Sequence, residues 1–393
     1  MVCMWLVPLA APAANPARIT IFAGDFDRRE CVVEVTSPPD HRTPQLLLVD
    51  AGGRTVPAQS TKGRVTFLEP SLRRGESRTY EMHSNPTSSK TLEMTAKRAA
   101  LVVQFSQGGR RLFDYQTAPG DVPVGVPEHF KHGAHLHPVF SPSGKLVTGN
   151  HPPDHRWHRG IWMSWTKTEF AGRHPDFWNM GKDGGGQFTG EIRFDKLVEG
   201  WNGSVHAGVM SEHRHIDHTG GAAQDVLRET WELRAYRSTG ARNVIDLIST
   251  QVTSGQEPLK LPKYHYGGLG VRGNAAWDPK DKVAMLTSEG HDRKAGDATK
   301  AKWVWMGGQV DGGPTGIAVL IHPDNFRFPQ PLRLNPSNPQ LCVVPSQDGD
   351  WEITPGKPYV SKYRFVVFDG PANKELIERL WNDYAHPPTV KVE

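Results

Sequence analysis

Cysteine is scarce in this chain, which has 3 among 393 residues. If an apolar N-terminal segment is removed, only Cys31 and Cys342 remain. Two cysteines so far apart in the sequence exclude a disulfide scaffold and a thiolate metal site. They could form one bridge or remain two buried thiols, and we expect buried thiols.

A large excess of one charge is also missing. The chain has 46 Lys and Arg against 42 Asp and Glu, a formal net charge of +4, and no block of consecutive basic residues. Proteins that bind polyanions normally carry a basic patch, so we expect no nucleic acid partner. No apolar run approaches the roughly 20 residues of a membrane-spanning helix, so we expect no membrane partner.

Several catalytic signatures are absent as well. The sequence has no Gly-x-Ser-x-Gly, no phosphate-binding P-loop, no Cys/His dyad and no kinase signature. It shows no repeat of fixed period and no low-complexity tract. The function must therefore be inferred from side chains that the fold brings together.

The first residues form a short apolar segment. Residues 1–14 contain an apolar run followed by Ala11-Pro12-Ala13. This pattern resembles the apolar region and small-residue cleavage site of a secretory signal, although no basic region precedes the apolar run. We predict a secreted or periplasmic protein on this basis; the alternative is a cytoplasmic one.

Strand patterns dominate the rest of the chain. Short β-branched or apolar runs, separated by Gly, Pro, Asp and Asn, predict strands at residues 17–22, 30–35, 45–49, 64–67, 101–105, 188–194, 204–211, 226–236, 243–252, 315–321 and 362–368. One amphipathic helix is predicted at residues 373–384. We expect an all-β antiparallel sandwich or supersandwich, with a small N-terminal β unit at residues 15–88, a large domain at residues 89–393 and a C-terminal helix.

Histidines are concentrated in one stretch. Seven of the 18 lie between His129 and His158, interleaved with Pro, Gly and Asp, which favours a site on a loop. On an extended segment His151 and His155 lie on one side and His158 on the other, unless the chain turns at Pro152. His151 and His155 are candidate ligands of a divalent metal, with Asp154 beside them. The alternative is that these imidazoles only hydrogen bond to loop backbone.

Three further stretches carry polar side chains suited to a site. His135-Leu136-His137 precedes a hairpin turn, Tyr264-His265-Tyr266 precedes a Gly pair, and His322 and Asn325 follow a strand. The chain also has 12 Trp, and five of them lie close in sequence to these motifs: Trp162, Trp165, Trp178, Trp303 and Trp305. Indoles beside polar donors suit a sugar ring, although many of them must also fill the core.

Taken in order, these motifs resemble a soluble bacterial family catalogued as PmoA-like and labelled methane oxygenase PmoA. The resemblance covers roughly residues 112–369. It is carried by His137-Pro138 with Ser141-Pro142-Ser143-Gly144-Lys145, Thr148, Asp154-His155 with His158-Arg159-Gly160, Asp176-Phe177-Trp178, Gly268-Leu269-Gly270 with Arg272, and Gly316 to His322-Pro323 with Asn325. It implies a fold related to the galactose-mutarotase-type supersandwich, which sugar epimerases, lyases and glycosidases use.

Our first hypothesis is an exported carbohydrate-active enzyme, a glycoside hydrolase or lyase. His158 or His265 would act as general base or acid, Asp154 would orient an imidazole, and Arg159 and Arg272 would stabilise developing negative charge. Substrate contacts are expected from His137, Trp162, Trp165, Trp178, Tyr266, His322 and Asn325. A hydrolase would need paired carboxylates, for which the candidates are Asp154, Glu229 and Glu289.

Two alternatives remain open at this stage. A non-catalytic carbohydrate-binding protein would need the aromatic residues but not the histidines. A metal-dependent oxygenase, as the family label states, would assemble its site from His151, His155 and Asp154. No cofactor other than a possible divalent metal is expected.

Overall fold

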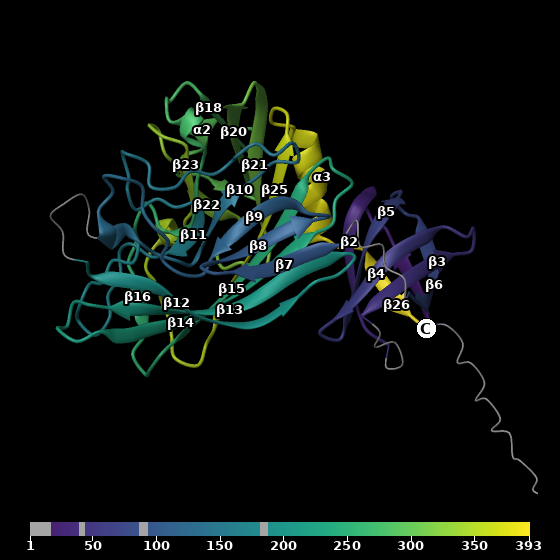
Figure 1. The fold of residues 1–393 in the computed structure, drawn as a ribbon, viewed down its shortest axis with the longest axis horizontal. Helices are drawn as coiled ribbons and strands as arrows, with labels where there is room; N and C mark the ends of the chain where they lie inside the picture. The colour runs from purple at the N-terminus through teal and green to yellow at the C-terminus, as the bar shows by residue number, and fades with distance from the viewer. Residues whose placement is uncertain (1–16, 39–43, 86–92, 181–187) are drawn as a thin grey trace, which may run out of the picture.

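The computed structural model describes residues 17–38, 44–85, 93–180 and 188–393. Within these residues, antiparallel strands form three large sheets and a short two-stranded one, which confirms the all-β prediction. Figure 1 shows a large body on one side and a smaller sheet on the other. The apolar segment at residues 1–14 lies outside the described residues.

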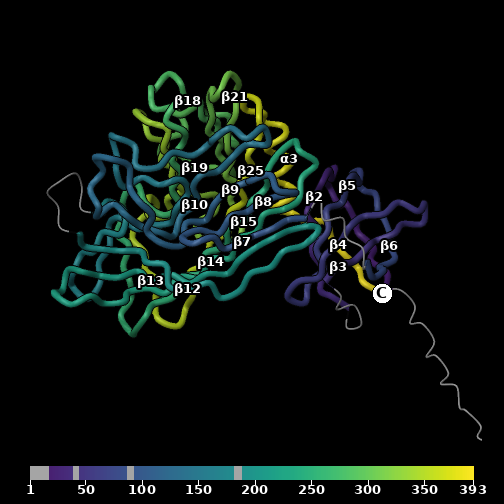
Figure 2. The backbone as a smooth tube through the Cα atoms, viewed as in Figure 1, coloured from purple at the N-terminus to yellow at the C-terminus, as the bar shows by residue number. Residues whose placement is uncertain are grey.

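The smaller sheet is built mainly from the N-terminal part of the chain. Its order is β2-β5-β4-β3-β6-β1-β26, with bounds β1 Arg18–Phe22, β2 Arg28–Thr36, β3 Gln45–Asp50, β4 Thr55–Thr61, β5 Arg64–Leu72, β6 Ser77–Ser84 and β26 Thr389–Val392. β26 pairs with β1 from Ile19 opposite Val392 to Phe22 opposite Thr389. The end of the chain therefore returns to the N-terminal sheet (Figure 2), which the expected division near residue 88 did not anticipate.

The large body contains two sheets. The first has the order β19-β22-β23-β17-β11-β10-β9-β8-β7, with bounds β7 Met94–Ala99, β8 Val102–Gln107, β9 Arg110–Gln116, β10 His135–Val139, β11 Ile161–Ser164, β17 Gly268–Arg272, β19 Lys300–Ala301, β22 Gln330–Leu334 and β23 Gln340–Val343. We call it the nine-stranded sheet. β10, which carries His135 and His137, and β11, which follows the loop with His151, His155 and His158, lie near its middle.

The second sheet has the order β12-β13-β14-β15-β25-β21-β20-β18, with bounds β12 Gly190–Trp201, β13 His206–Asp217, β14 Gln224–Tyr236, β15 Asn243–Thr253, β18 Val283–Thr287, β20 Trp303–Val310, β21 Gly313–Ile321 and β25 Tyr359–Asp369. We call it the eight-stranded sheet. Leu136, Ile161 and Val271 of the first sheet share one buried cluster with Leu247 and Phe365 of the second. The two sheets therefore pack face to face as a sandwich, as expected.

Short elements complete the large body. They are β16 Leu259–Leu261 paired with β24 Trp351–Ile353, the α-helices α2 Arg293–Gly296 and α3 Lys374–Ala385, and the 3-10 turns η2 Glu128–Phe130, η3 Ala275–Trp277 and η4 Pro345–Asp348. Helix α3 begins after Asn373, whose side chain accepts a hydrogen bond from the Leu376 N–H. Its apolar face packs on Trp303 and Leu320. The C-terminal helix predicted from the sequence is confirmed.

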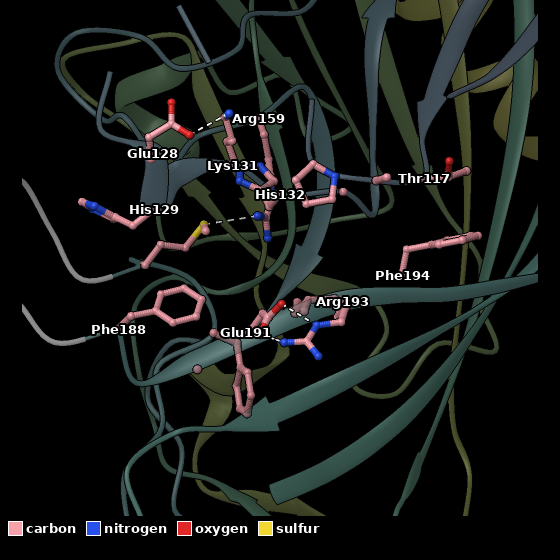
Figure 3. A pocket seen from close by; sticks show the side chains of 17 residues that line it. Thr117, Glu128, His129, Lys131, His132, Arg159, Phe188, Glu191, Arg193 and Phe194 are labelled. Carbon is pink, nitrogen blue, oxygen red and sulfur yellow. Dashed lines mark hydrogen bonds and ion pairs between the residues drawn. The ribbon is translucent and has the colours of Figure 1, made fainter. Parts of the chain in front are cut away.

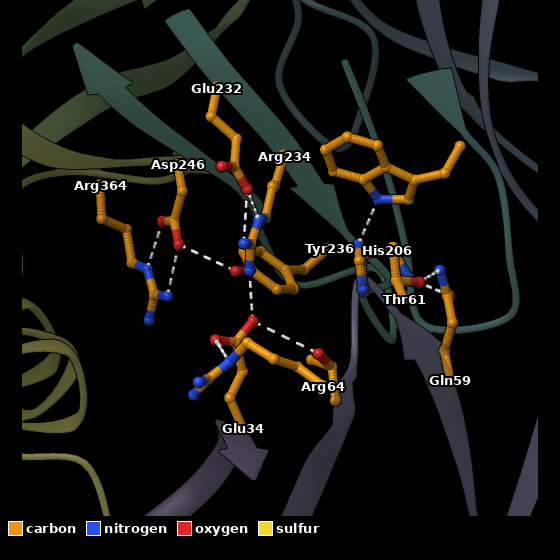
Figure 4. A network of polar contacts seen from close by, with 12 residues as sticks. Glu34, Gln59, Thr61, Arg64, His206, Glu232, Arg234, Tyr236, Asp246 and Arg364 are labelled. Carbon is orange, nitrogen blue, oxygen red and sulfur yellow. Dashed lines mark hydrogen bonds and ion pairs between the residues drawn. The ribbon is translucent and has the colours of Figure 1, made fainter. Parts of the chain in front are cut away.

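A polar interface joins the N-terminal sheet to the outer face of the eight-stranded sheet. Arg234 on β14 forms an ion pair with Glu34 on β2 (Figure 4). Gln59 on β4 accepts hydrogen bonds at 3.1 Å from the backbone N–H groups of Val205 and His206. Charge-assisted contacts of this kind fix the orientation of the two units.

Two of the expectations from composition can be checked directly. Cys31 and Cys342 are both buried free thiols, as expected. No helix among the described residues is long and apolar enough to cross a membrane.

Candidate functional site

The loop between His151 and His158 turns back on itself. The His151 N–H donates to the carbonyl of His158 at 2.9 Å, and the His158 N–H donates to the carbonyl of His155 at 2.9 Å. The turn stacks the two rings of His155 and His158, with centroids 4.5 Å apart and an interplanar angle of 16°. The sequence left open whether these two imidazoles would share a side, and the turn brings them together.

Gly160 sets the direction of the residues that precede β11. It has a φ of 39°, and a Cβ at this position would lie 1.9 Å from the carbonyl oxygen of Leu136. A glycine is required because β10 approaches the backbone too closely for any side chain. His158 then lines one cavity and Arg159 lines another.

Arg272 on β17 holds the loop between His151 and His158 in place. Its guanidinium is fully buried, and Nη2 lies 2.9 Å from Asp154 Oδ1 and 2.6 Å from Asp278 Oδ1. The Asn338 amide also donates to Asp154 Oδ2, at 2.7 Å. Burial alone would raise the pKa of Asp154, but hydrogen bonds from His155 and Arg272 outweigh it and hold that pKa well below its usual range.

His155 is oriented by this carboxylate. Its Nδ1 lies 2.9 Å from Asp154 Oδ2. An ionised carboxylate only accepts hydrogen bonds, so Nδ1 carries the proton and Nε2 keeps its lone pair. An imidazole held in this way can accept a proton from a neighbouring group.

His158 has the opposite tautomer. Its Nδ1 lies 3.3 Å from Nη1 of Arg272, which can only donate, so Nδ1 accepts and Nε2 carries the proton. Burial, the neighbouring His155 and the Arg272 charge keep the pKa of His158 well below its usual range. The ring therefore stays neutral at pH 7 and offers an N–H donor.

The two imidazoles line a cavity of about 360 Å³. Its other lining residues are Trp157, Trp178, Asn179, His265, Tyr266, Arg333, Asn335 and Gln340. Among the described residues no Asp or Glu lines it. We call it the His155 cavity; its volume lies within the range of about 300–1,000 Å³ that is typical of small-molecule sites.

Aromatic side chains form one side of the His155 cavity. Trp178 packs edge-to-face on Tyr266, with centroids 5.7 Å apart, and Tyr266 donates to the Asn179 side chain at 3.1 Å. Burial raises the pKa of Tyr266, which keeps its hydroxyl protonated. Trp162 lies beneath, and a Cβ on Gly270 would come within 2.7 Å of both indoles. The glycine at 270 therefore lets Trp162 and Trp178 pack directly on the β17 backbone.

Comparison with known proteins places this architecture in a family. Residues 102–382 match the model described as "Family of unknown function (DUF6807)". The chain belongs to this family. No curated protein matches this DUF6807 sequence. The match does not bear on the PmoA-like resemblance, which stays a prediction.

Among solved structures, one match is a GalM/aldose epimerase homologue from C. elegans, with 9% identity and a TM-score of 0.31. It covers 72% of this chain and 99% of the other. The antiparallel sandwich described above rests on the sheets themselves, and the match carries no inference about function.

The structure brings several of the predicted site residues of this DUF6807 member together. His155, His158, Trp178, His265 and Tyr266 all line the His155 cavity. Asp154, Arg272 and Trp162 lie directly behind them and position them. Within the part of the chain that is described, this cavity gathers more of the predicted residues than any other.

Other predicted residues lie elsewhere. His322 packs on Tyr384 of α3, and Asn325 exchanges hydrogen bonds with the backbone of Lys362, so neither contributes to this cavity. Trp165 donates to Gln251 inside the sandwich. His137 contacts the Thr148 hydroxyl at 2.9 Å and does not line the His155 cavity.

The two arginines also differ from expectation. Arg272 is held by two carboxylates and does not line the cavity. Arg159 faces a separate cavity on the other side of its loop. Neither guanidinium is placed to stabilise charge that develops on a ligand in the His155 cavity.

The donor set does not fit a divalent metal. His151 donates from Nδ1 to the Arg156 carbonyl at 2.8 Å, whereas His155 and Asp154 bond to each other beside the positive charge of Arg272. Among residues 17–38, 44–85, 93–180 and 188–393, no group of three or more His, Cys, Asp or Glu could hold a metal ion. We derive no chemistry through a metal.

The candidate carboxylates do not form a pair. Glu229 lies fully buried between the sheets, where His215 Nε2 at 3.0 Å, the Ser249 hydroxyl at 2.5 Å and the Gln251 amide at 3.0 Å contact it. Burial would raise its pKa, but hydrogen bonds and charge from His213 and His215 outweigh it and lower that pKa. Glu289 is exposed. None of the three candidate carboxylates, Asp154 included, lines the His155 cavity.

Sequence reasoning missed some residues of the cavity. Arg333 and Asn179 line it and carry no local signal in the sequence. Asn338, which does not line the cavity but binds Asp154, is 184 positions away from it. Trp157 stood inside the histidine motif and could have been found from its neighbours. The structure places it on the wall of the cavity.

Proposed function

We propose that this DUF6807 protein is a carbohydrate-active enzyme that removes a proton from a sugar, a lyase rather than a hydrolase. The observation that carries the proposal is the Asp154–His155 pair, which leaves a lone pair on Nε2 of an imidazole that lines the His155 cavity. Trp157 and Trp178, which are largely buried, line the cavity with indole groups that the C–H side of a sugar ring could contact.

In the proposed reaction, His155 Nε2 takes the proton from the carbon next to a carbonyl or carboxyl group of the sugar. The electron pair of the broken C–H bond forms a C=C bond as the neighbouring C–O bond breaks. The Nε2–H of His158 and the Arg333 guanidinium stabilise the oxyanion that develops. The departing oxygen takes a proton from Tyr266, whose raised pKa keeps the hydroxyl protonated until the reaction.

Elimination is favoured over hydrolysis by what lines the cavity. Glycoside hydrolysis usually needs two carboxyl groups on opposite sides of the bond. Among the described residues, the lining of the His155 cavity contains imidazole, amide, phenol, guanidinium and indole groups but no carboxyl group. Asp154 contacts Arg272 and Asn338 and acts through His155.

The test uses purified protein and a panel of oligosaccharides that contain neutral and uronic sugars. We expect the unmodified protein to release unsaturated products, which are measured by their ultraviolet absorbance. His155→Gln should lower turnover by about 100- to 10,000-fold, the usual contribution of a general base. The control His291→Gln changes an exposed histidine outside the cavity and should keep the activity.

One result would replace the proposal with a binding function. This result has three parts: a glycan binds to the protein, its affinity falls in Trp178→Ala, and His155→Gln changes neither the affinity nor the product. The protein would then be a non-catalytic carbohydrate-binding protein.

Export remains part of the proposal, because it was inferred from residues 1–14. Fractionation of cells that produce the full chain tests it independently.

A further inference from the structure

A second cavity lies on the other side of the His158–Arg159 segment. Its volume is about 560 Å³, and it is lined by His132, Arg159 and the rings of Phe177, Phe188 and Phe194 among others. Figure 3 shows Lys131, His132 and Arg159 on one side of it, and Glu191 and Arg193 of β12 on the opposite side. We call it the Arg159 cavity.

Arg159 is the unusual group in this cavity. It is 2% exposed, and among the described residues no carboxylate lies within ion-pair distance of it. Among the described residues, Nη1 of Arg159 contacts the sulfur of Met180 at 3.4 Å, and its Nε has no partner. Burial lowers the pKa of Arg159 to about 9, so the group is still charged at neutral pH. A buried charge without a partner is costly and points to a missing anion.

The other charges around the Arg159 cavity are already compensated. Lys131 pairs with Glu128 at 2.6 Å, and Arg193 pairs with Glu191 at 2.6 Å. Arg159 is therefore the uncompensated positive charge among the described lining residues. One uncompensated cation calls for a ligand with one negative charge.

Buried acceptors lie beside this charge. His132 Nδ1 bonds to the Phe130 carbonyl at 2.6 Å, and His135 Nδ1 bonds to the Gly133 carbonyl at 3.2 Å, so both Nε2 atoms keep lone pairs. Neither Nε2 has a hydrogen-bond partner, and the rings lie 5.0 Å apart. Burial and the Arg159 charge keep the pKa of both rings well below the usual range, so they remain acceptors. Lone pairs of this kind are satisfied by hydroxyl donors.

We infer that the Arg159 cavity is a binding site for a hydroxylated carboxylate, of which a sugar acid such as a uronate is the simplest example. The planar carboxylate would bond to the guanidinium of Arg159, and a neighbouring hydroxyl would donate to Nε2 of His132. The phenylalanine rings would contact the apolar face of the sugar. This inference does not rest on the proposed function, because Arg159 and His155 line different cavities.

The experiment compares D-glucuronate, D-glucose and glucose 6-sulfate by isothermal titration calorimetry with the full chain. Glucuronate is expected to bind at least about tenfold more tightly than glucose. Arg159→Met keeps the volume of the side chain but removes the charge, and it should abolish this preference. Lys260→Met is the matched control, because it removes a charge that already has a partner, Glu169, and lies outside both cavities, so it should keep the preference.

Two further variants make the result specific. His132→Phe keeps Arg159 and removes one acceptor, so glucuronate affinity should fall while some preference over glucose remains. His155→Gln should leave glucuronate binding unchanged, whatever it does to turnover. Thermal unfolding of each variant without ligand confirms that it folds.

Several results would overturn the inference. Glucuronate that binds no better than glucose, or equally well to Arg159→Met, would show that Arg159 does not hold an anion. Binding of glucose 6-sulfate as tight as that of glucuronate would contradict the carboxylate assignment. Loss of glucuronate binding in His155→Gln would place the ligand in the other cavity.

Discussion

Arg159 and Arg272 are two buried arginines whose surroundings differ completely. Arg272 contacts Asp154 and Asp278 and is neutralised by them, whereas Arg159 has no carboxylate partner among the described residues. Each lies beside a histidine-lined cavity of the same sandwich. A satisfied buried cation positions its neighbours, and an unsatisfied one is a place where a ligand can bind.

The same contrast appears in the histidines beside each arginine. Arg272 donates to His158, and the carboxylate that it holds orients His155, so these two rings have defined tautomers that suit proton transfer. His132 and His135, near Arg159, instead have Nε2 atoms without partners. The first arrangement is the one on which we base the proposed proton transfer, and the second is the one on which we base the proposed binding site.

The largest effect is expected from breaking the Asp154–His155 contact. Asp154→Asn offers an amide where Nδ1 of His155 needs an acceptor, which favours the wrong tautomer, and turnover should fall by about 100- to 10,000-fold. Asp278→Asn is the matched control, because Asp278 contacts Arg272 but not His155. Initial rates on the substrate found in the oligosaccharide panel measure both. Equal losses in the two variants would mean that the carboxylates only neutralise Arg272.

Replacing each arginine by methionine tests the comparison through stability. Arg272→Met leaves Asp154 and Asp278 without their cation and should lower the free energy of unfolding by about 3 kcal/mol. Arg159→Met removes a charge that has no partner and should leave the stability of the ligand-free protein unchanged or raise it by about 1 kcal/mol. Urea denaturation of both variants checks this. A loss in Arg159→Met as large as that in Arg272→Met would show that Arg159 is already satisfied.

Much of the fold could be predicted because its strands carry a local signal. The alternation at residues 226–236 predicts a strand with one buried face, and β14 runs from Gln224 to Tyr236. The return of β26 to pair with β1 could not be predicted in this way. That pairing joins residues at the two ends of the chain, and a short strand such as Thr389–Val392 carries no information about its partner.

The candidate site was predictable only where it is local. His155 and His158 are three positions apart, so a single turn brings them together. The direction of Arg159 depends on the left-handed backbone of Gly160 against β10, which no periodicity reveals. The structure also buries His132 in the lining of the cavity that Arg159 lines, which its place in the histidine stretch does not predict.

Acid should destabilise the protein through its buried neutral histidines. Burial keeps the pKa of His137 and of His206 at about 4, and keeps the pKa of His132, His135 and His158 well below the usual value. The unfolded chain binds protons below about pH 6.5 that the folded chain cannot, so stability is complete above this pH and declines toward about pH 4. Each histidine contributes up to about 1.4 kcal/mol per pH unit.

The two arginine variants should change this pH dependence differently. After burial, the charge of Arg159 helps to lower the pKa values of five histidines, whereas Arg272 acts on one of them, His158; the five are His132, His135, His151, His158 and His213. Removing the Arg159 charge should raise all five pKa values, so the decline should be shallower in Arg159→Met than in Arg272→Met. Urea denaturation between about pH 8 and about pH 5 measures the slopes. Identical slopes in the two variants would show that burial alone sets these pKa values.

The smallest effect is expected at Met180, which separates the two sites. Phe177 and Met180 line the Arg159 cavity, and the two residues between them, Trp178 and Asn179, line the His155 cavity. Met180→Leu removes the sulfur that Arg159 contacts but keeps the volume, so the free energy of unfolding should fall by less than about 1.5 kcal/mol. Tyr266→Phe is the counterpart on the other side, because it removes the hydrogen bond to Asn179 and should cost about 1 kcal/mol. If Met180→Leu instead costs as much as Arg272→Met, the sulfur contact is a major stabiliser of the Arg159 charge, and the contrast between the two arginines fails.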